Sequence, residues 1–143
     1  MDVYVDASVL LRIVLAEPEP LTSWSGIDRP ISSELIRVEC LRTIERARLS
    51  LRVSEVAAAE QRAGALEMIA ALTLVPVTPA VLERAGDPFP TTLSTLDAIH
   101  LATALAVRDR FDGLRVATHD TELGLAARAM GFEVDGLLGY TRL

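Results

Sequence analysis

The chain has 143 residues, of which 50% are hydrophobic, and its length fits one compact domain, 1–143, with a substantial core. Its single cysteine, Cys40, excludes an internal disulfide and a cysteine-based metal cluster. The net charge of −6 argues against a general basic surface for nucleic acid, and the absence of lysine excludes every mechanism that needs one.

The first half of the chain predicts two short strands and three helices. We expect a strand at 3–5 that ends at Asp6, a helix at 9–17 before Pro18, and a helical turn at 21–24. A second strand is expected at 30–32, followed by helices at 34–49 and 55–72 that pair as an antiparallel hairpin.

The second half alternates strands with helices. Strands are expected at 73–77, 114–118 and 132–134, and helices at 79–85, 94–111 and 121–130. This alternation predicts an α/β fold of three layers, α/β/α, with a four- or five-stranded, mainly parallel sheet. No apolar run reaches the roughly 18 residues of a membrane span, so we expect a soluble, cytoplasmic protein.

The segment from Ser94 to Phe111 is the centre of the predicted fold. Ser94 can cap this helix, and the residues that follow are apolar nearly all round until Arg108, which indicates a buried helix. Asp97, in its first turn, should therefore be partly desolvated. A buried carboxylate is costly unless a cap, a cation or a metal compensates it.

Acidic side chains are expected to converge at one edge of the sheet. In an open parallel sheet, ligands bind beyond the carboxyl ends of the strands, where Asp6 and Asp120 follow two of them. Asp97 lies in the first turn, and Glu39 in the second turn, of helices that should leave the same edge. Hydroxyls lie two residues from the terminal acids, at Ser8 and Thr118.

Each acid also has an ordinary structural interpretation. Asp6 and Asp120 can cap helices, Asp97 can complete a capping box, and Glu39 can pair with Arg42. These interpretations do not explain why all four acids should lie at one edge. Clustered carboxylates repel one another until a cation enters, and Mg²⁺ or Mn²⁺ prefers such oxygen ligands. One or two such ions could hold a phosphodiester and activate a water molecule.

Four segments of the chain resemble a known family. These segments are VYVDASVLLRIVL, ISSELIRVECLRTI, STLDAIHLATAL and VATHDTEL. Their order and spacing resemble the motifs of PIN-domain proteins, specifically the VapC-type toxin ribonucleases of bacterial toxin–antitoxin pairs. The resemblance runs from Asp2 to about Gly131. It implies a metal-dependent endoribonuclease that needs Mg²⁺ or Mn²⁺, hydrolyses RNA, forms a homodimer and is silenced by a cognate VapB-type antitoxin.

The resemblance also implies the residues of the site. Four acids match the catalytic and metal-binding positions of the family: Asp6, Glu39, Asp97 and Asp120. Ser8 and Thr118 match hydroxyl positions that support the site. Glu122 falls where some members carry a further acid, but its side chain should point elsewhere on the helix.

Several other residues receive a structural interpretation. His119 should point away from Asp120, His100 should be a satisfied core or interface histidine, and Cys40 should pack in an apolar stripe. Trp24 and Phe89 are expected to pack rather than to frame a groove.

Two arginines, Arg42 and Arg46, share a helix face with Glu39. They can either contact an RNA phosphate or pair with Glu39 or Glu45.

Three other functions compete with a nuclease. A receiver-type phosphorylation domain needs a lysine, which the chain lacks. A phosphatase with an aspartyl nucleophile would carry a second aspartate at the position of Ser8. The remaining alternative is a catalytically silent PIN-like module that binds metal, RNA or a partner protein.

Overall fold

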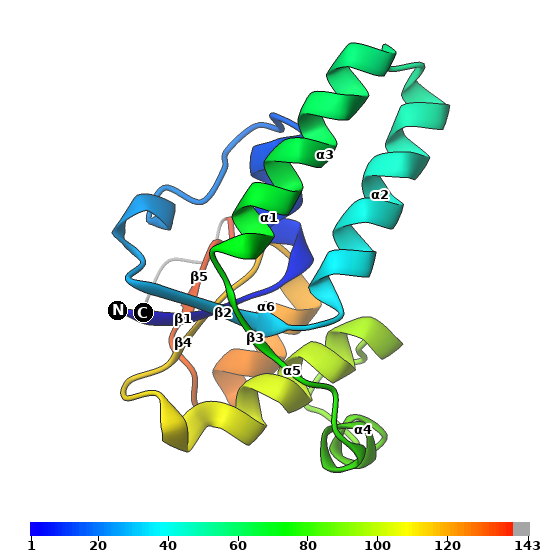
Figure 1. The fold of residues 1–143 in the computed structure, drawn as a ribbon. Helices are drawn as coiled ribbons and strands as arrows, with labels where there is room; N and C mark the ends of the chain where they lie inside the picture. Colours follow the sequence, from blue (N-terminus) through cyan, green and yellow to red (C-terminus); the bar gives the residue numbers. More distant parts are fainter. Residues whose placement is uncertain (139–143) are drawn as a thin grey trace.

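Five parallel strands form one sheet in the computed structural model, which describes residues 1–138 (Figure 1). In spatial order the strands are β3 (Thr73–Val75), β2 (Arg29–Ser33), β1 (Asp2–Val5), β4 (Arg115–Ala117) and β5 (Val134–Asp135). Every neighbouring pair is parallel. The expected mainly parallel sheet is thus confirmed, with β1 at its centre.

Helices cover both faces of this sheet, which confirms the three-layer α/β/α arrangement (Figure 1). One face carries α1 (Ala7–Val14), α2 (Ile36–Leu51) and α3 (Glu55–Ala70). The other carries α4 (Pro79–Ala85), α5 (Thr95–Val107) and α6 (Thr121–Ala129). The pair α2 and α3 forms an antiparallel hairpin that extends well beyond the sheet (Figure 1). None of the helices in residues 1–138 has the length and hydropathy of a membrane span.

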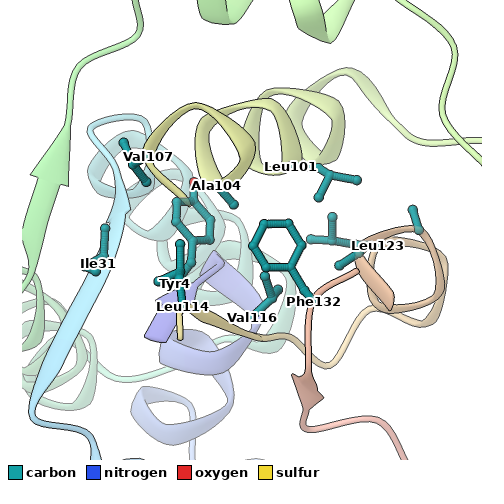
Figure 2. Packing of buried hydrophobic residues seen from close by; sticks show 11 residues of the cluster. Tyr4, Ile31, Leu101, Ala104, Val107, Leu114, Val116, Leu123 and Phe132 are labelled. Atoms are coloured by element: carbon teal, nitrogen blue, oxygen red, sulfur yellow. The ribbon is translucent and has the colours of Figure 1, made fainter. Parts of the chain in front are cut away.

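The central strand supplies the core on both faces, because successive side chains of a strand point to opposite sides. Val3 and Val5 pack with α1 and α2. Tyr4 packs on the other face, where Figure 2 shows it in the cluster that contains Leu101 and Phe132. The helix α5 is buried along most of its length, as its apolar sequence predicted.

Some predicted element ends were wrong. The first helix ends at Val14 rather than at Glu17, and the chain then turns through Ala16, whose φ is +52°. The central helix ends at Val107 and continues as a short 3-10 helix at Arg108–Arg110. The helical turn expected at 21–24 is a 3-10 helix at Trp24–Gly26. These ends are fixed by local turn hydrogen bonds, which an apolar pattern does not encode.

Candidate active site

Asp6 lies where the central strands end, at the carboxyl edge of the sheet. In the parallel pairing, Val5 lies opposite Ala117, so the residues that follow β1 and β4 are neighbours. Asp6 is 4% exposed, and its two carboxylate oxygens accept hydrogen bonds from Ser8 Oγ at 2.5 Å and Thr118 Oγ1 at 2.7 Å. Its side chain does not cap α1, so the capping interpretation of this acid was wrong.

The two hydroxyls also connect Asp6 to the turn that begins α6. Ser8 Oγ accepts the backbone N–H of His119 at 2.9 Å, and Thr118 Oγ1 accepts that of Asp120 at 3.0 Å. Both hydroxyls were predicted to support the acids. Each hydroxyl thus donates to Asp6 and accepts a backbone N–H from the segment that follows β4.

Asp97 and Asp120 lie at the starts of two helices that begin at this edge. The backbone N–H of Asp97 donates to Ser94 Oγ at 3.2 Å, which caps α5 as predicted. Asp120 caps α6 by accepting the N–H of Leu123 on Oδ1 at 2.8 Å. The capping interpretation of Asp120 is therefore correct, but it uses only one of the two carboxylate oxygens.

The charges of these acids act on one another. Burial raises the pKa of Asp97 to about 6, and the negative charges of Asp120 and Asp6 add to this effect. Burial also raises the pKa of Asp6, and the charge of Glu39 adds to it, against the opposing effects of His100 and the two hydroxyls. The acids are thus electrostatically coupled, as expected for carboxylates that share one edge of the sheet.

Glu39 is held by His100, which the sequence pattern indicated as a structural residue only. Its Oε1 lies 2.6 Å from Nε2 of His100, which is 1% exposed on α5. Nδ1 of the same ring lies 2.7 Å from the hydroxyl of Tyr4, and that hydroxyl accepts the N–H of Ser33 at 3.1 Å. In the neutral ring, Tyr4 therefore donates to Nδ1, and Nε2–H donates to Glu39.

This hydrogen-bonded chain changes the interpretation of two residues. The ordinary interpretation of Glu39 as a partner of Arg42 does not apply, because the carboxylate turns toward α5 instead. His100 is a satisfied core histidine, as predicted, but it also belongs to the site. The signal in the sequence was a titratable side chain three residues after Asp97 on an otherwise apolar helix.

The donor set fits a hard divalent cation. In residues 1–138 no three acidic, histidine or cysteine side chains are already drawn together closely enough to bind an ion. The side chains at this edge nevertheless offer carboxylate oxygens, which Mg²⁺ and Mn²⁺ prefer. Within the same residues no arginine forms an ion pair with any of the four acids. A cation would therefore relieve a repulsion that no arginine in these residues offsets.

A comparison with protein families identifies the fold. Residues 3–129 match the family model described as the PIN domain. The chain belongs to the PIN-domain family. This match spans the carboxyl edge of the sheet together with all four acids.

Curated relatives of this PIN domain carry the name VapC. The chain is 36% identical over 135 residues to Ribonuclease VapC46 of Mycobacterium tuberculosis. The alignment covers 92% of this chain and 95% of that protein. It is 31% identical over 137 residues to Ribonuclease VapC47 of the same species, covering 91% of this chain and 93% of the relative. The predicted resemblance to VapC-type PIN domains is confirmed.

A solved structure shares the fold. A chain in the crystal structure of VapBC2 from Rickettsia felis bound to a DNA fragment from their promoter superposes with a TM-score of 0.60. The alignment covers 94% of this chain and 98% of that chain, at 9% sequence identity. At this identity the likeness supports the fold and nothing more.

The remaining candidate residues of this PIN domain lie outside the acidic cluster. His119 Nδ1 lies 2.8 Å from the carbonyl oxygen of Gly136, so its ring is held against the chain after β5. Glu122 is exposed on α6. Cys40 is fully buried among apolar side chains, and burial raises the pKa of its thiol to about 12. Trp24 and Phe89 pack against the core clusters, as predicted.

Proposed function

We propose that this PIN domain is a metal-dependent endoribonuclease and the toxin of a type II toxin–antitoxin pair. The observation that carries the proposal is the coupling of Asp6, Asp97 and Asp120 at the carboxyl edge of the sheet, where burial, together with the charges of Asp120 and Asp6, raises the pKa of Asp97 to about 6. The names of its relatives support ribonuclease activity. The substrate class is RNA, cut at a phosphodiester bond.

The proposed metal site consists of four carboxylates, Asp6, Glu39, Asp97 and Asp120, with Mg²⁺ or Mn²⁺ as the cofactor. When bound, such an ion holds phosphate oxygens and lowers the pKa of a coordinated water molecule. Asp6 and Asp97 are the first choice as ligands. Asp120 contributes the oxygen that does not cap α6.

The protein's own side chains keep these acids in place. Ser8 and Thr118 fix both oxygens of Asp6, which prevents the carboxylate from rotating. His100 fixes one oxygen of Glu39 and leaves the other available to the site. Because these partners are mainly buried, the acids are oriented before any ligand binds, which reduces the cost of assembling the site.

The proposed partners are a cognate VapB-type antitoxin and a second copy of this chain. The structural neighbour is part of a VapBC complex, which supports an antitoxin partner for this chain as well. The net charge of −6 and the acidic site suit a basic inhibitory segment.

A second candidate is a catalytically silent PIN-like module that binds metal, RNA or a partner protein. This alternative stays open because all four acids can be present in a module whose site does not admit a substrate. The two functions differ in one respect that can be measured. The nuclease cleaves RNA when a divalent cation is supplied, whereas the silent module binds without cleaving.

Cleavage of a synthetic RNA pool with a randomised central segment tests the proposal. We expect cleavage in Mn²⁺, loss of cleavage in EDTA, and loss in Asp97→Asn with an unchanged circular dichroism spectrum. Glu122→Gln is the matched control, because it removes an exposed acid two residues after Asp120 and should retain activity. Equal cleavage by Asp97→Asn would contradict the proposed site. A folded wild type that binds Mn²⁺ without cutting the pool would favour the silent module.

A further inference from the structure

Two exposed arginines extend from the acidic site along α2. Arg42 and Arg46 lie three and seven residues after Glu39, which places all three side chains on one side of the helix. At 1.5 Å per residue, Arg46 lies about 10 Å further along the helix than Glu39. The pair therefore forms a short basic row that begins at the site and continues along the projecting α2–α3 hairpin (Figure 1).

Neither arginine is neutralised by the carboxylates that could have paired with it. Glu39 is held by His100, and the two oxygens of Glu45 accept hydrogen bonds from Arg48 at 2.6 and 3.1 Å. Arg48 is the main cause of the lowered pKa of Glu45, with a smaller contribution from the charge of Arg42. The sequence left open whether these arginines pair with acids, and the structure shows that they do not.

The contacts of Arg42 and Arg46 within the protein are few. Arg46 Nη2 donates to the hydroxyl of Thr43 at 3.2 Å. Within residues 1–138, Arg42 makes neither a hydrogen bond nor an ion pair. Other arginines hold the fold together, since Arg115 binds Asp135 at 2.8 Å and Arg108 donates to the carbonyl of Met130 at 2.7 Å. The row on α2 thus keeps most of its hydrogen-bonding capacity for a ligand.

An anionic polymer is the ligand class that matches this arrangement. A protein with a net charge of −6 and an acidic site repels a nucleic acid strand except where cations are placed. The guanidinium group binds phosphate oxygens through paired hydrogen bonds. Arg42 and Arg46 are about 6 Å apart along the helix, which corresponds to one or two nucleotides of a stacked strand at roughly 3.4 Å each.

We propose that Arg42 and Arg46 bind consecutive backbone phosphates of the RNA strand on one side of the cleaved bond. The row would give the strand a defined path along α2, toward the tip of the hairpin. This inference rests on the proposed function, because it extends the substrate path from the same acidic site. It concerns the binding of the strand and not the chemical step.

A double variant with a matched control tests this path. Arg42→Gln with Arg46→Gln removes the row. Arg110→Gln with Arg128→Gln removes two exposed arginines near the C-terminal ends of α5 and α6, whereas the site lies at the N-terminal ends of these helices. Both doubles lose the same charge. The probe is a fluorescein-labelled 20-nucleotide single-stranded RNA, bound to the Asp97→Asn protein and followed by anisotropy at several KCl concentrations.

The row variant should bind this RNA about tenfold more weakly than the control double at low salt. The slope of log affinity against log salt should fall by about 1.4, at about 0.7 for each phosphate contact to a single strand. In the active background and Mn²⁺, KM for the RNA should rise while kcat stays unchanged.

Three results would count against these proposals. Equal affinity and equal slopes for the two doubles would overturn the inference. Preserved RNA binding with loss of binding to poly-L-glutamate would also overturn it, because the row would then belong to an acidic protein segment. Failure of the wild type to cleave in Mn²⁺ would refute the proposed function instead, and the binding slopes would still decide whether Arg42 and Arg46 hold phosphates.

Discussion

His100 Nε2 lies 2.6 Å from a carboxylate oxygen of Glu39, although the two residues are 61 positions apart in the chain. The contact joins α5 to the first turn of α2. It continues through Nδ1 of the same ring to the hydroxyl of Tyr4, at the centre of the sheet. The position of an acid at the proposed site is therefore determined from within the core.

Replacement of Tyr4 by phenylalanine tests this chain of hydrogen bonds. The change keeps the ring but leaves His100 Nδ1 and the N–H of Ser33 without a partner in a buried place. We expect the free energy of unfolding to fall by about 1–3 kcal/mol, measured by urea denaturation. The losses from Tyr4→Phe and His100→Gln should not add in the double variant, because both break one network. Strict additivity would contradict a connected chain.

The protonation of His100 gives a second prediction. Burial lowers the pKa of this imidazole, but the hydrogen bond and charge of Glu39, together with the charges of Asp6 and Asp97, outweigh burial and raise the pKa above 6.5. Its protonated form therefore stabilises the fold fully below pH 6.5, and this stabilisation is lost as the pH rises through the folded pKa. Glu39→Gln should lower the pKa of His100, measured by NMR titration of the ring protons. Glu45→Gln is the control and should leave the pKa of His100 unchanged, because Glu45 is bound to Arg48 instead.

Removal of the charge of Asp97 should stabilise the metal-free protein. The raised pKa, about 6, means that ionisation of Asp97 is costly in the folded state. The wild type loses stability as the pH rises from 3.8 through about 6, and Asp97→Asn avoids this loss. After allowance for solvent screening at this partly exposed group, we expect a gain of about 1 kcal/mol at pH about 7.5.

The pH dependence of this gain separates repulsion from capping. Thermal melts should show the advantage of Asp97→Asn shrinking as the pH falls through about 6 and vanishing below 3.8, where Asp97 is protonated in both states. A variant that is less stable than the wild type at every pH would mean that the carboxylate serves mainly the N-terminus of α5.

The glycine after β5 gives a prediction about the backbone next to the proposed site. Gly136 has a φ of +100°, and an added Cβ would lie 2.6 Å from the carbonyl oxygen of Thr118. Gly136→Ala should therefore lower the free energy of unfolding by about 1–3 kcal/mol, measured by denaturant titration. Gly26→Ala is the control, because the added Cβ would meet nothing within 4 Å. The free energy of unfolding of this variant should be unchanged or slightly higher.

The positions of the acids were predictable because they follow from local rules. Asp6 comes directly after an apolar strand segment, and Asp120 follows shortly after another. The carboxyl ends of parallel strands share one edge of the sheet. Asp97 could be placed at the same edge from its cap, Ser94. These inferences required only the order of elements and the direction of the strands.

The partners of the acids were not predictable in the same way. The contact of Glu39 with His100 depends on how α2 and α5 sit relative to β1, and the contact of Tyr4 with His100 spans 96 positions. Helical spacing indicated Arg42 as the partner of Glu39, because it describes neighbours on one helix only. A carboxylate at the start of a helix can instead turn toward another element.

Binding of a divalent cation by the four carboxylates at the edge of the sheet is the property on which the proposed function depends. The most direct test is a thermal melt of the metal-free protein and of Asp97→Asn, each with and without Mn²⁺. A ligand that binds only the folded state stabilises it by about 2.7 kcal/mol at a hundredfold excess over its Kd. We predict a rise in Tm with Mn²⁺ for the wild type and none for Asp97→Asn. An equal rise in both proteins, or no rise in either, would contradict the proposed metal site.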